Sequence, residues 1–267
     1  MTPTLEIVIP VRNPDATLLR TAASLAAQTD RRFEVLLSGN SRAGLEQVEE
    51  AARQLVLAGI TVRRADAPGE LKRLEHWNLA HSLARGDWLK PLLPGDVLTP
   101  EYVERLKLRL EERPEAQFVR CDAELRTEWG WEILRAPFDD ARIGAAQFGD
   151  YFPAKVEWIC RLANVAYSRI AWLASGGYCN QLPGFASLNL NVTLALHHGL
   201  ENIAEALVRV ESADRLPLNE STGERVNLPL ELWLALRQAR NYCIAAKVPW
   251  RRQWPCCRAA AARMGHW

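Results

Sequence analysis

Short apolar runs alternate with longer segments of helical periodicity over the first hundred residues. Each run is rich in β-branched or bulky residues and is bounded by Pro, Gly or polar residues, which predicts a strand. The predicted strands are Leu5–Pro10, Phe33–Leu37, Ile60–Val62 and Trp88–Leu93. The segments between them, ending near Ala26, Leu57 and Leu83, predict helices. This β-α-β-α-β-α-β order with continuous apolar strands indicates an α/β fold, a Rossmann-like, mostly parallel sheet with helices on both faces.

The pattern is less regular after residue 100. It predicts a helix at 101–112, a strand at 116–121, a long loop region with short elements at 126–154, a helix at 188–198 closed by Gly199, and a last strand at 203–210. A polar linker then leads to a helix at about 230–246 and a basic, aromatic tail. We therefore expect a domain at 1–211 and a C-terminal helical extension with the tail at 212–267.

Composition excludes several classes of protein. The chain has 267 residues, 48% apolar, and a formal net charge of +1, so no global charge favours a nucleic-acid partner. The first eleven residues do not form a signal peptide, and no run of eighteen apolar residues predicts a membrane span. The six cysteines lack a metal-ligand spacing. A cytoplasmic protein is the expectation.

Two nucleotide-binding motifs are also excluded. Gly39–Gly44 has the glycine spacing of a phosphate-binding P-loop, but Leu45 and Glu46 follow it where that loop needs Lys and then Ser or Thr. No Gly-x-Gly-x-x-Gly follows the first strand, which argues against a dehydrogenase. His-Glu-x-x-His, Gly-x-Ser-x-Gly and Cys-x-x-Cys motifs are absent from the sequence as well.

One strand and turn stand out as a candidate site. The run Trp88–Leu93 leads into Pro94 and Gly95, which bend the chain, and Asp96 follows at the carboxyl end of the strand. Open α/β sheets bind their ligands in the crevice beyond the strand ends. Asp96 is therefore a candidate ligand-binding acid, although an acid after Pro-Gly is also an ordinary turn residue.

Several motifs recur in an order and spacing that are fairly specific together. They are Pro10 with Asn13, Ala27-Gln28-Thr29, Asn78 followed by Gly86-Asp87-Trp88-Leu89, and Gly176-Gly177-Tyr178. With them, the stretch from about Leu5 to Glu211 resembles a family 2 glycosyltransferase of the GT-A fold. The resemblance implies a nucleotide-sugar donor, a glycan or lipid-linked acceptor, and a divalent metal, Mg²⁺ or Mn²⁺, held by Asp96. It also implies a set of nucleotide-sugar-binding residues: Pro10, Val11, Asn13, Gly39, Asn40, Asn78 and Asp96.

The chain departs from this family at three acidic positions. Gly39 and Asn40 stand where family members carry two acids after the second strand. The family's Asp-x-Asp metal motif aligns with Leu93–Asp96, so only its last acid remains, and Ala186-Ser187 replaces the acidic pair that supplies the catalytic base. One carboxylate can hold a metal together with phosphates and waters, but more weakly than two or three.

The general base is consequently left open. Asp122 and Glu124 end a predicted strand that faces the same crevice, which makes them the candidate catalytic residues. Asp139, Asp140 and Glu157 are further possibilities.

The sequence thus predicts an enzyme that moves a sugar from a nucleotide sugar to an acceptor hydroxyl, in polysaccharide or glycoconjugate synthesis. The alternative is a catalytically degenerate domain that binds nucleotide, sugar or a protein partner without turnover. The tail interleaves Trp250, Arg251, Arg252 and Trp254, as interfacial segments do, so peripheral contact with the inner face of a membrane, or a membrane-surface scaffold, is a further possibility. Equally, those tryptophans can pack on the domain.

Overall fold

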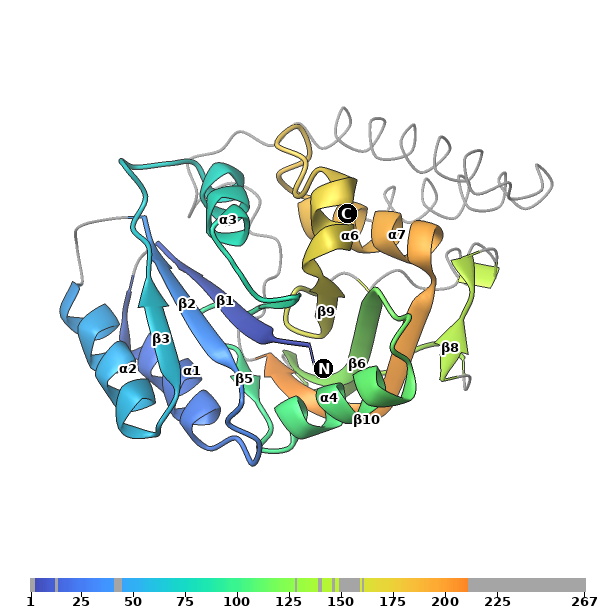
Figure 1. The fold of residues 1–267 in the computed structure, drawn as a ribbon, viewed down its shortest axis with the longest axis horizontal. Coiled ribbons are helices and arrows are strands. Elements are labelled where there is room, and N and C mark those ends of the chain that lie inside the picture. The colour runs from blue at the N-terminus through green and yellow to red at the C-terminus, as the bar shows by residue number, and fades with distance from the viewer. Residues whose placement is uncertain are drawn as a thin grey trace.

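The fold is known from a computed structural model, which describes residues 3–12, 14–40, 45–127, 129–138, 141–145, 147–148, 159 and 161–210. Within these residues, ten strands form one mixed sheet in the order β3-β2-β1-β4-β9-β6-β10-β5, with β7 added to β6 and β8 to β10 (Figure 1). The strands are β1 Leu5–Val11, β2 Glu34–Gly39, β3 Thr61–Arg64, β4 Trp88–Pro91, β5 Val97–Leu98, β6 Phe118–Thr127, β7 Gly130–Leu134, β8 Arg142–Ile143, β9 Val165–Ser168 and β10 Leu200–Val210.

The predicted parallel arrangement is confirmed for the first four strands. β1 pairs in parallel with β2 and β4, and β2 pairs in parallel with β3. β9 is antiparallel to both β4 and β6, so β6 again runs in the direction of β4. The carboxyl ends of β1, β2, β3, β4 and β6 therefore meet at the same edge of the sheet, which we call the carboxyl edge.

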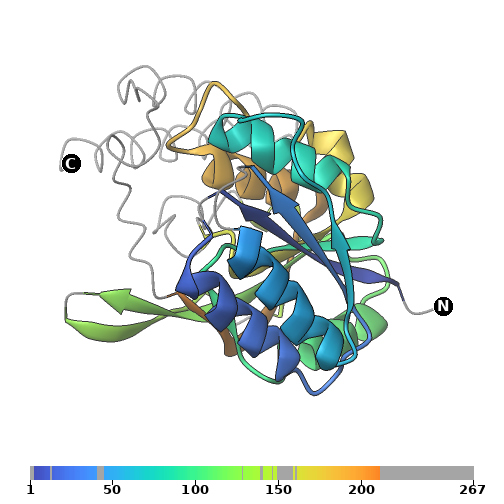
Figure 2. The same ribbon diagram turned by 90° about the vertical axis from the view of Figure 1, so that its left-hand side faces the viewer.

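Helices cover both faces of the sheet, as predicted (Figures 1 and 2). Buried residues of α1, α2 and α4 pack with one face of β1 and β2 in one core cluster, and buried residues of α3, α6 and α7 pack with the other face in a second. Alternate strand residues supply the two cores, which is why these strands read as continuous apolar runs. The helices are α1 Ala16–Ala26, α2 Leu45–Leu57, α3 Arg73–Ser82, α4 Tyr102–Glu112, α6 Arg169–Ser175 and α7 Ala186–His198.

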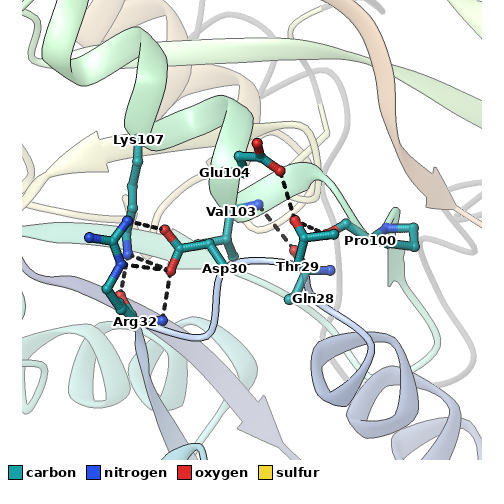
Figure 3. A network of polar contacts seen from close by, with 8 residues as sticks. All are labelled: Gln28, Thr29, Asp30, Arg32, Pro100, Val103, Glu104 and Lys107. Atoms are coloured by element: carbon teal, nitrogen blue, oxygen red, sulfur yellow. Dashed lines mark hydrogen bonds and ion pairs between the residues drawn. The ribbon is translucent and has the colours of Figure 1, made fainter.

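A polar network fastens the opposite edge of the sheet (Figure 3). Gln28, just after α1, donates to the Thr99 carbonyl at 2.7 Å and accepts from the Val103 N–H at 3.0 Å, while Thr29 Oγ1 donates to Glu104 at 2.9 Å. The bond to Val103 satisfies a backbone N–H that the first turn of α4 leaves without a partner. The Gln-Thr motif at the end of the first helix therefore has a structural role in this chain.

Asp30 completes this network beside the buried Lys107. Burial by itself raises the pKa of Asp30, but hydrogen bonds from Arg32 and Lys107 outweigh it and hold the pKa well below its usual range. Lys107 lies 3.1 Å from Asp30, so the loop into β2 is tied to α4.

The predicted loop region with short elements contains a hairpin in its first part. β6 continues to Thr127 and turns into β7, and the resulting hairpin projects from the body of the molecule (Figure 2). All of β7 except Leu134 is exposed, so no buried apolar run indicated a strand there.

Two predictions fall wholly or partly outside the described residues. The C-terminal helical extension and the tail lie at 212–267, and with them the proposed domain boundary. Among the described helices, none combines the length and the apolar character needed to cross a membrane.

Candidate functional site

The first part of the site is the end of β1 and β2. Pro10 pairs with Ser38 and Val11 with Gly39, and the Asn40 N–H donates to the Val11 carbonyl at 2.9 Å. Four of the predicted donor-site residues, Pro10, Val11, Gly39 and Asn40, are therefore neighbours at the carboxyl edge. Asn13, the fifth, lies outside the described residues.

The side chain of Asn40 binds the protein's own backbone. Its Nδ2 donates to the Leu71 carbonyl at 2.8 Å, and its Oδ1 accepts from the Leu71 N–H at 2.9 Å. The residue is 3% exposed. Asn40 thus holds the segment before α3 against the end of β2, and both ends of its amide are used in doing so.

Asp66, which the sequence reasoning did not single out, also reaches this edge. A Cβ atom on Gly39 would lie 2.5 Å from Asp66 Oδ1, so this carboxylate lies directly beside the end of β2. Arg64 Nη2 is 3.6 Å from Asp66 Oδ2, and the Asp66 side chain stays 58% exposed. An acid directly after the third strand was the available signal, since strand ends meet at this edge.

Arg12 and His76 are two further basic residues here that the sequence reasoning missed. His76 is buried, and its Nε2 lies 3.1 Å from Ser38 Oγ at the end of β2. Burial, opposed by the bond to Ser38 and reinforced by the nearby Arg12 charge, lowers the pKa of His76 to about 4. Arg12 Nη1 is buried, and no group in the described structure accepts a hydrogen bond from it. An orphaned guanidinium donor beside a neutral histidine favours an acceptor-rich, anionic ligand.

Asn78 joins α3 to the Gly176-Gly177-Tyr178 segment. Its Nδ2 donates to the Tyr178 carbonyl at 2.8 Å and its Oδ1 accepts from the Tyr178 N–H at 2.8 Å. Gly177 has a φ of +74°, and a Cβ there would lie 2.6 Å from Asn78 Oδ1. The asparagine and the glycine pair, noted separately in the sequence, are therefore one structural clamp.

Asp96 lies at the carboxyl edge as predicted, in the turn after β4, but it is almost wholly buried, at 3% exposed. Thr21 of α1 holds this turn: its Oγ1 accepts from the Gly95 N–H at 2.9 Å and donates to the Asp96 carbonyl at 2.8 Å. The turn is thus fixed on the α1 face of the sheet.

The charge of Asp96 also acts on Lys90, a fully buried residue of β4. The Lys90 ammonium bonds to backbone carbonyls, among them Pro91 at 3.1 Å and Val165 at 3.2 Å. Burial lowers the pKa of Lys90 to about 8, although the charges of Cys121 and Asp96 oppose the shift. Asp96 therefore serves in part as a counter-ion within the protein.

The residues present offer limited support for a metal. In the described parts of the chain, no group of three or more His, Cys, Asp or Glu side chains is placed to hold one. Asp96 supplies one carboxylate, and the positive charge of Lys90 already interacts with it. Such a donor set fits only an ion that arrives already bound to phosphate oxygens.

Asp122 lies level with the carboxyl edge on β6, which β9 separates from β4. Leu89 and Phe118 both pair with Tyr167 of β9, so Leu93 and Asp122 each lie four residues further toward the carboxyl edge. Asp122 also lines a cavity of about 350 Å³ beside β6, β7 and β10. The cavity is therefore at the same level of the sheet as Leu93, which precedes the turn that carries Asp96.

A buried arginine orients Asp122. Arg120 Nη1 donates to Asp122 Oδ1 at 2.6 Å and to Asn202 Oδ1 at 2.7 Å, and the Ala136 N–H contacts the same Asp122 oxygen at 3.3 Å. Asp122 Oδ2 makes no hydrogen bond to any described group. One oxygen is thus held by the protein, and the other is available to a ligand in the cavity.

Glu124 is placed differently from Asp122. Its Oε2 pairs with Arg209 of β10 at 2.7 Å, and the side chain is 33% exposed. It does not line the cavity. Of the other acids considered, Asp139, Asp140 and Glu157 lie outside the described residues.

Comparison with solved structures identifies a related fold. The chain superposes on S. aureus TarS 1–349 in complex with UDP with a TM-score of 0.75, at 10% sequence identity, over 99% of this chain and 72% of that one. It superposes on the TarS 1–349 complex with UDP-GlcNAc with a TM-score of 0.68, at 11% identity, over 89% and 67%. No protein-family model matches the chain, and no curated protein sequence does.

The predicted GT-A class of fold is therefore confirmed. The chain has the α/β fold of the glycosyltransferase TarS, whose structures hold UDP and UDP-GlcNAc. At this level of identity the match concerns the fold. The roles of individual residues follow only from their geometry in this chain.

Proposed function

We propose that this chain is a glycosyltransferase that binds a nucleotide sugar at the carboxyl edge and transfers the sugar to an acceptor hydroxyl, in polysaccharide or glycoconjugate synthesis. The observation that carries the proposal is the fold match over 99% of the chain to a protein solved with UDP. It is supported by the strand-end residues that the fold brings to that edge, where open α/β sheets bind ligands.

On the donor side, Pro10, Val11 and Gly39 form the backbone wall, and Asn40 and Asn78 set the position of the loops around it. Asn13, two residues after β1 in the sequence, lies outside the described residues and stays a predicted donor-site residue. Arg12 and Asp66 are the charged side chains at hand: the orphaned Arg12 donor suits a phosphate or a base carbonyl, and Asp66 suits a base N–H or a ribose hydroxyl.

A divalent ion, Mg²⁺ or Mn²⁺, would be held by Asp96 together with the diphosphate oxygens of the donor. When bound, such an ion neutralises the charge that develops on the leaving diphosphate. Because the chain offers a single carboxylate, we expect the free protein to bind the metal weakly and the nucleotide to carry it in.

On the acceptor side, Asp122 is our candidate for the base. The acceptor oxygen would attack the anomeric carbon, forming the new C–O bond as the bond to the diphosphate breaks, and the hydroxyl proton would pass to Asp122 Oδ2. General-base assistance of this kind contributes roughly 10²–10⁴-fold to the rate. Arg120 orients the Asp122 carboxylate, whereas Glu124 is occupied by Arg209.

Calorimetry tests the donor half of the proposal. UDP, UDP-GlcNAc and other nucleoside diphosphates are titrated with and without Mn²⁺ into the full chain and into Asp96→Asn, with Glu50→Gln on the exposed face of α2 as the matched control. We expect metal-enhanced binding of a uridine nucleotide that Asp96→Asn weakens and Glu50→Gln does not. Failure of every nucleotide to bind, with or without metal, would sink the proposal.

The alternative, a degenerate domain that binds without turnover, is favoured by the replacement of acids at Gly39, Asn40, Leu93, Gly95 and Ala186. Release of UDP from UDP-GlcNAc, measured with and without a panel of oligosaccharides, distinguishes the two functions. Tight binding with no release above that of the Asp122→Asn variant under any condition would establish the alternative.

A further inference from the structure

An aromatic and cationic surface lies on the projecting hairpin of β6 and β7. Trp129 is 86% exposed, Trp131 42% and Ile133 49%. Arg209 and Arg126 lie over the Trp131 ring, with Cζ atoms 4.9 Å and 5.7 Å from its centroid. We call these five residues the Trp131 surface. A cluster of exposed apolar side chains with a polar rim marks an interaction site.

The Trp131 surface is continuous with the cavity that holds Asp122. Ile133 belongs to both, and Arg135 and Asn202 also line the cavity. A ligand lying along β7 would therefore extend, without leaving the protein, to the carboxylate at the carboxyl edge. The charged groups in the lining suit a hydroxyl-rich ligand rather than a lipid surface, which would leave Arg135 and the second carboxylate oxygen of Asp122 without partners.

Uncompensated positive charge marks this region. Arg209 is neutralised by Glu124, and Arg120 by Asp122. Arg126 and Arg135, by contrast, form no ion pair with any group in the described structure. Arg126 lies at the aromatic end and Arg135 at the cavity. Complementary charge on the ligand is expected at both places.

We propose that the Trp131 surface and the adjoining cavity form the acceptor subsite, and that the acceptor is an anionic glycan, a saccharide chain bearing carboxylate or phosphate groups. The C–H face of one sugar ring packs on Trp131, the anionic groups pair with Arg126 and Arg135, and the terminal hydroxyl lies at Asp122. This proposal rests on the proposed function, because only a transferase requires an acceptor at that carboxylate.

Binding of defined oligosaccharides to the full chain tests the subsite. The probes are tetragalacturonate, a phosphorylated maltotetraose and neutral maltotetraose, titrated at low and high salt. We expect at least one anionic probe to bind more tightly than the neutral one, with a preference that weakens at high salt. Trp131→Ala should weaken binding about tenfold, equivalent to about 1.4 kcal/mol, and Arg135→Gln should reduce the preference for the anionic probe.

Leu108→Ala, at an exposed apolar residue of α4, is the matched control and should bind like the wild type. Thermal melting of each variant verifies that it is folded. Failure of both anionic probes to bind, or equal binding by wild type and Trp131→Ala, overturns the subsite. So does flotation with phosphatidylglycerol vesicles that Trp131→Ala abolishes, if neither anionic glycan binds, because the surface would then contact membranes.

UDP titration of the same variants separates this proposal from the function on which it rests. We expect Trp131→Ala to bind UDP like the wild type. If UDP binds but glycan binding does not depend on Trp131, the acceptor subsite is wrong and the transferase function stands. If glycan binding depends on Trp131 but no nucleotide binds, the acceptor role is wrong together with the proposed function.

Discussion

The carboxyl ends of β1–β4 and the β6–β10 pair in the same sheet use their polar side chains differently. In the first region, the side-chain amides of Asn40 and Asn78 hydrogen-bond to backbone groups of neighbouring loops through both their nitrogen and their oxygen. At the second, Arg120 binds Asp122 and Asn202 side chain to side chain around a cavity. The first region is a frame, and the second is a preorganised polar site.

This difference bears on the three acidic positions at which the chain departs from the glycosyltransferase family. Where the resemblance to glycosyltransferases predicts carboxylates near β2 and β4, the chain retains residues that shape loops and a single buried acid, Asp96. Where the sequence offered only candidates, at β6, the structure holds Asp122 with one oxygen bound by Arg120 and its side chain lining a cavity. Function in this chain is therefore expected to depend more on the β6 region than the motif pattern suggests.

The largest effect should follow from breaking the β6 network with Arg120→Met. The substitution leaves Asp122, Asn202 and the Leu134 carbonyl without their buried donor, which should reduce the free energy of unfolding by about 3–5 kcal/mol. Urea denaturation measures it. Arg209→Met, which removes the exposed partner of Glu124, is the control and should cost no more than about 1 kcal/mol. Equal losses for the two variants would show that the β6 network is not preorganised.

The frame should respond to Asn78→Ala by an intermediate amount. Two backbone groups of Tyr178 lose their partners, which predicts a loss of about 2 kcal/mol in the free energy of unfolding, again by urea denaturation. Asn180→Ala removes only a 3.5 Å contact to the same amide and should change little. A loss below 0.5 kcal/mol, on the order of a surface substitution, would mean that Asn78 is available for a ligand after all.

The pH dependence of stability should originate in the frame, which buries neutral histidines. Burial lowers the pKa of His76 and of His81 to about 4 each, below the value of 6.5 expected in the unfolded chain. Because the unfolded state binds these protons first, their contribution is fully present above pH 6.5 and is lost as the pH falls toward 4.

Urea denaturation at pH 7, 6 and 5 checks this expectation. The wild type should lose stability across the series, and His76→Gln should lose less over the same range. His197→Gln, at an exposed residue at the end of α7, is the control and should follow the wild type. A wild-type stability that is flat from pH 7 to 5 would contradict the prediction.

The smallest effect is expected for a surface substitution remote from the carboxyl edge, which gives a reference value for both regions. Arg53→Ala removes the exposed i,i+3 ion pair with Glu50 on α2, remote from the carboxyl edge. Solvent screens such pairs, so the free energy of unfolding should change by about 0.5 kcal/mol or less. A change as large as that for Asn78→Ala would show that the two regions cannot be compared by single substitutions.

The sequence by itself determined the class of fold and the edge that holds the site. Apolar runs at β1, β2 and β4 with helical segments between them leave a covered parallel sheet as the simple solution, because both faces of each strand must be buried. Strand ends in such a sheet meet at one edge, so the sequence placed Pro10, Gly39 and Asp96 together there. Asp122 was expected at the end of its strand, but β6 continues past it to Thr127.

Only the tertiary structure decided what these side chains do. Asn40 and Asn78 read as ligand-binding amides, but their partners are backbone groups 31 and 100 residues away along the chain. The cavity arises where β7 and β10 meet β6, and β7 is an exposed strand without a buried apolar run to predict it. Hydrogen-bond partners and cavities depend on contacts between distant segments, and local periodicity carries no information about them.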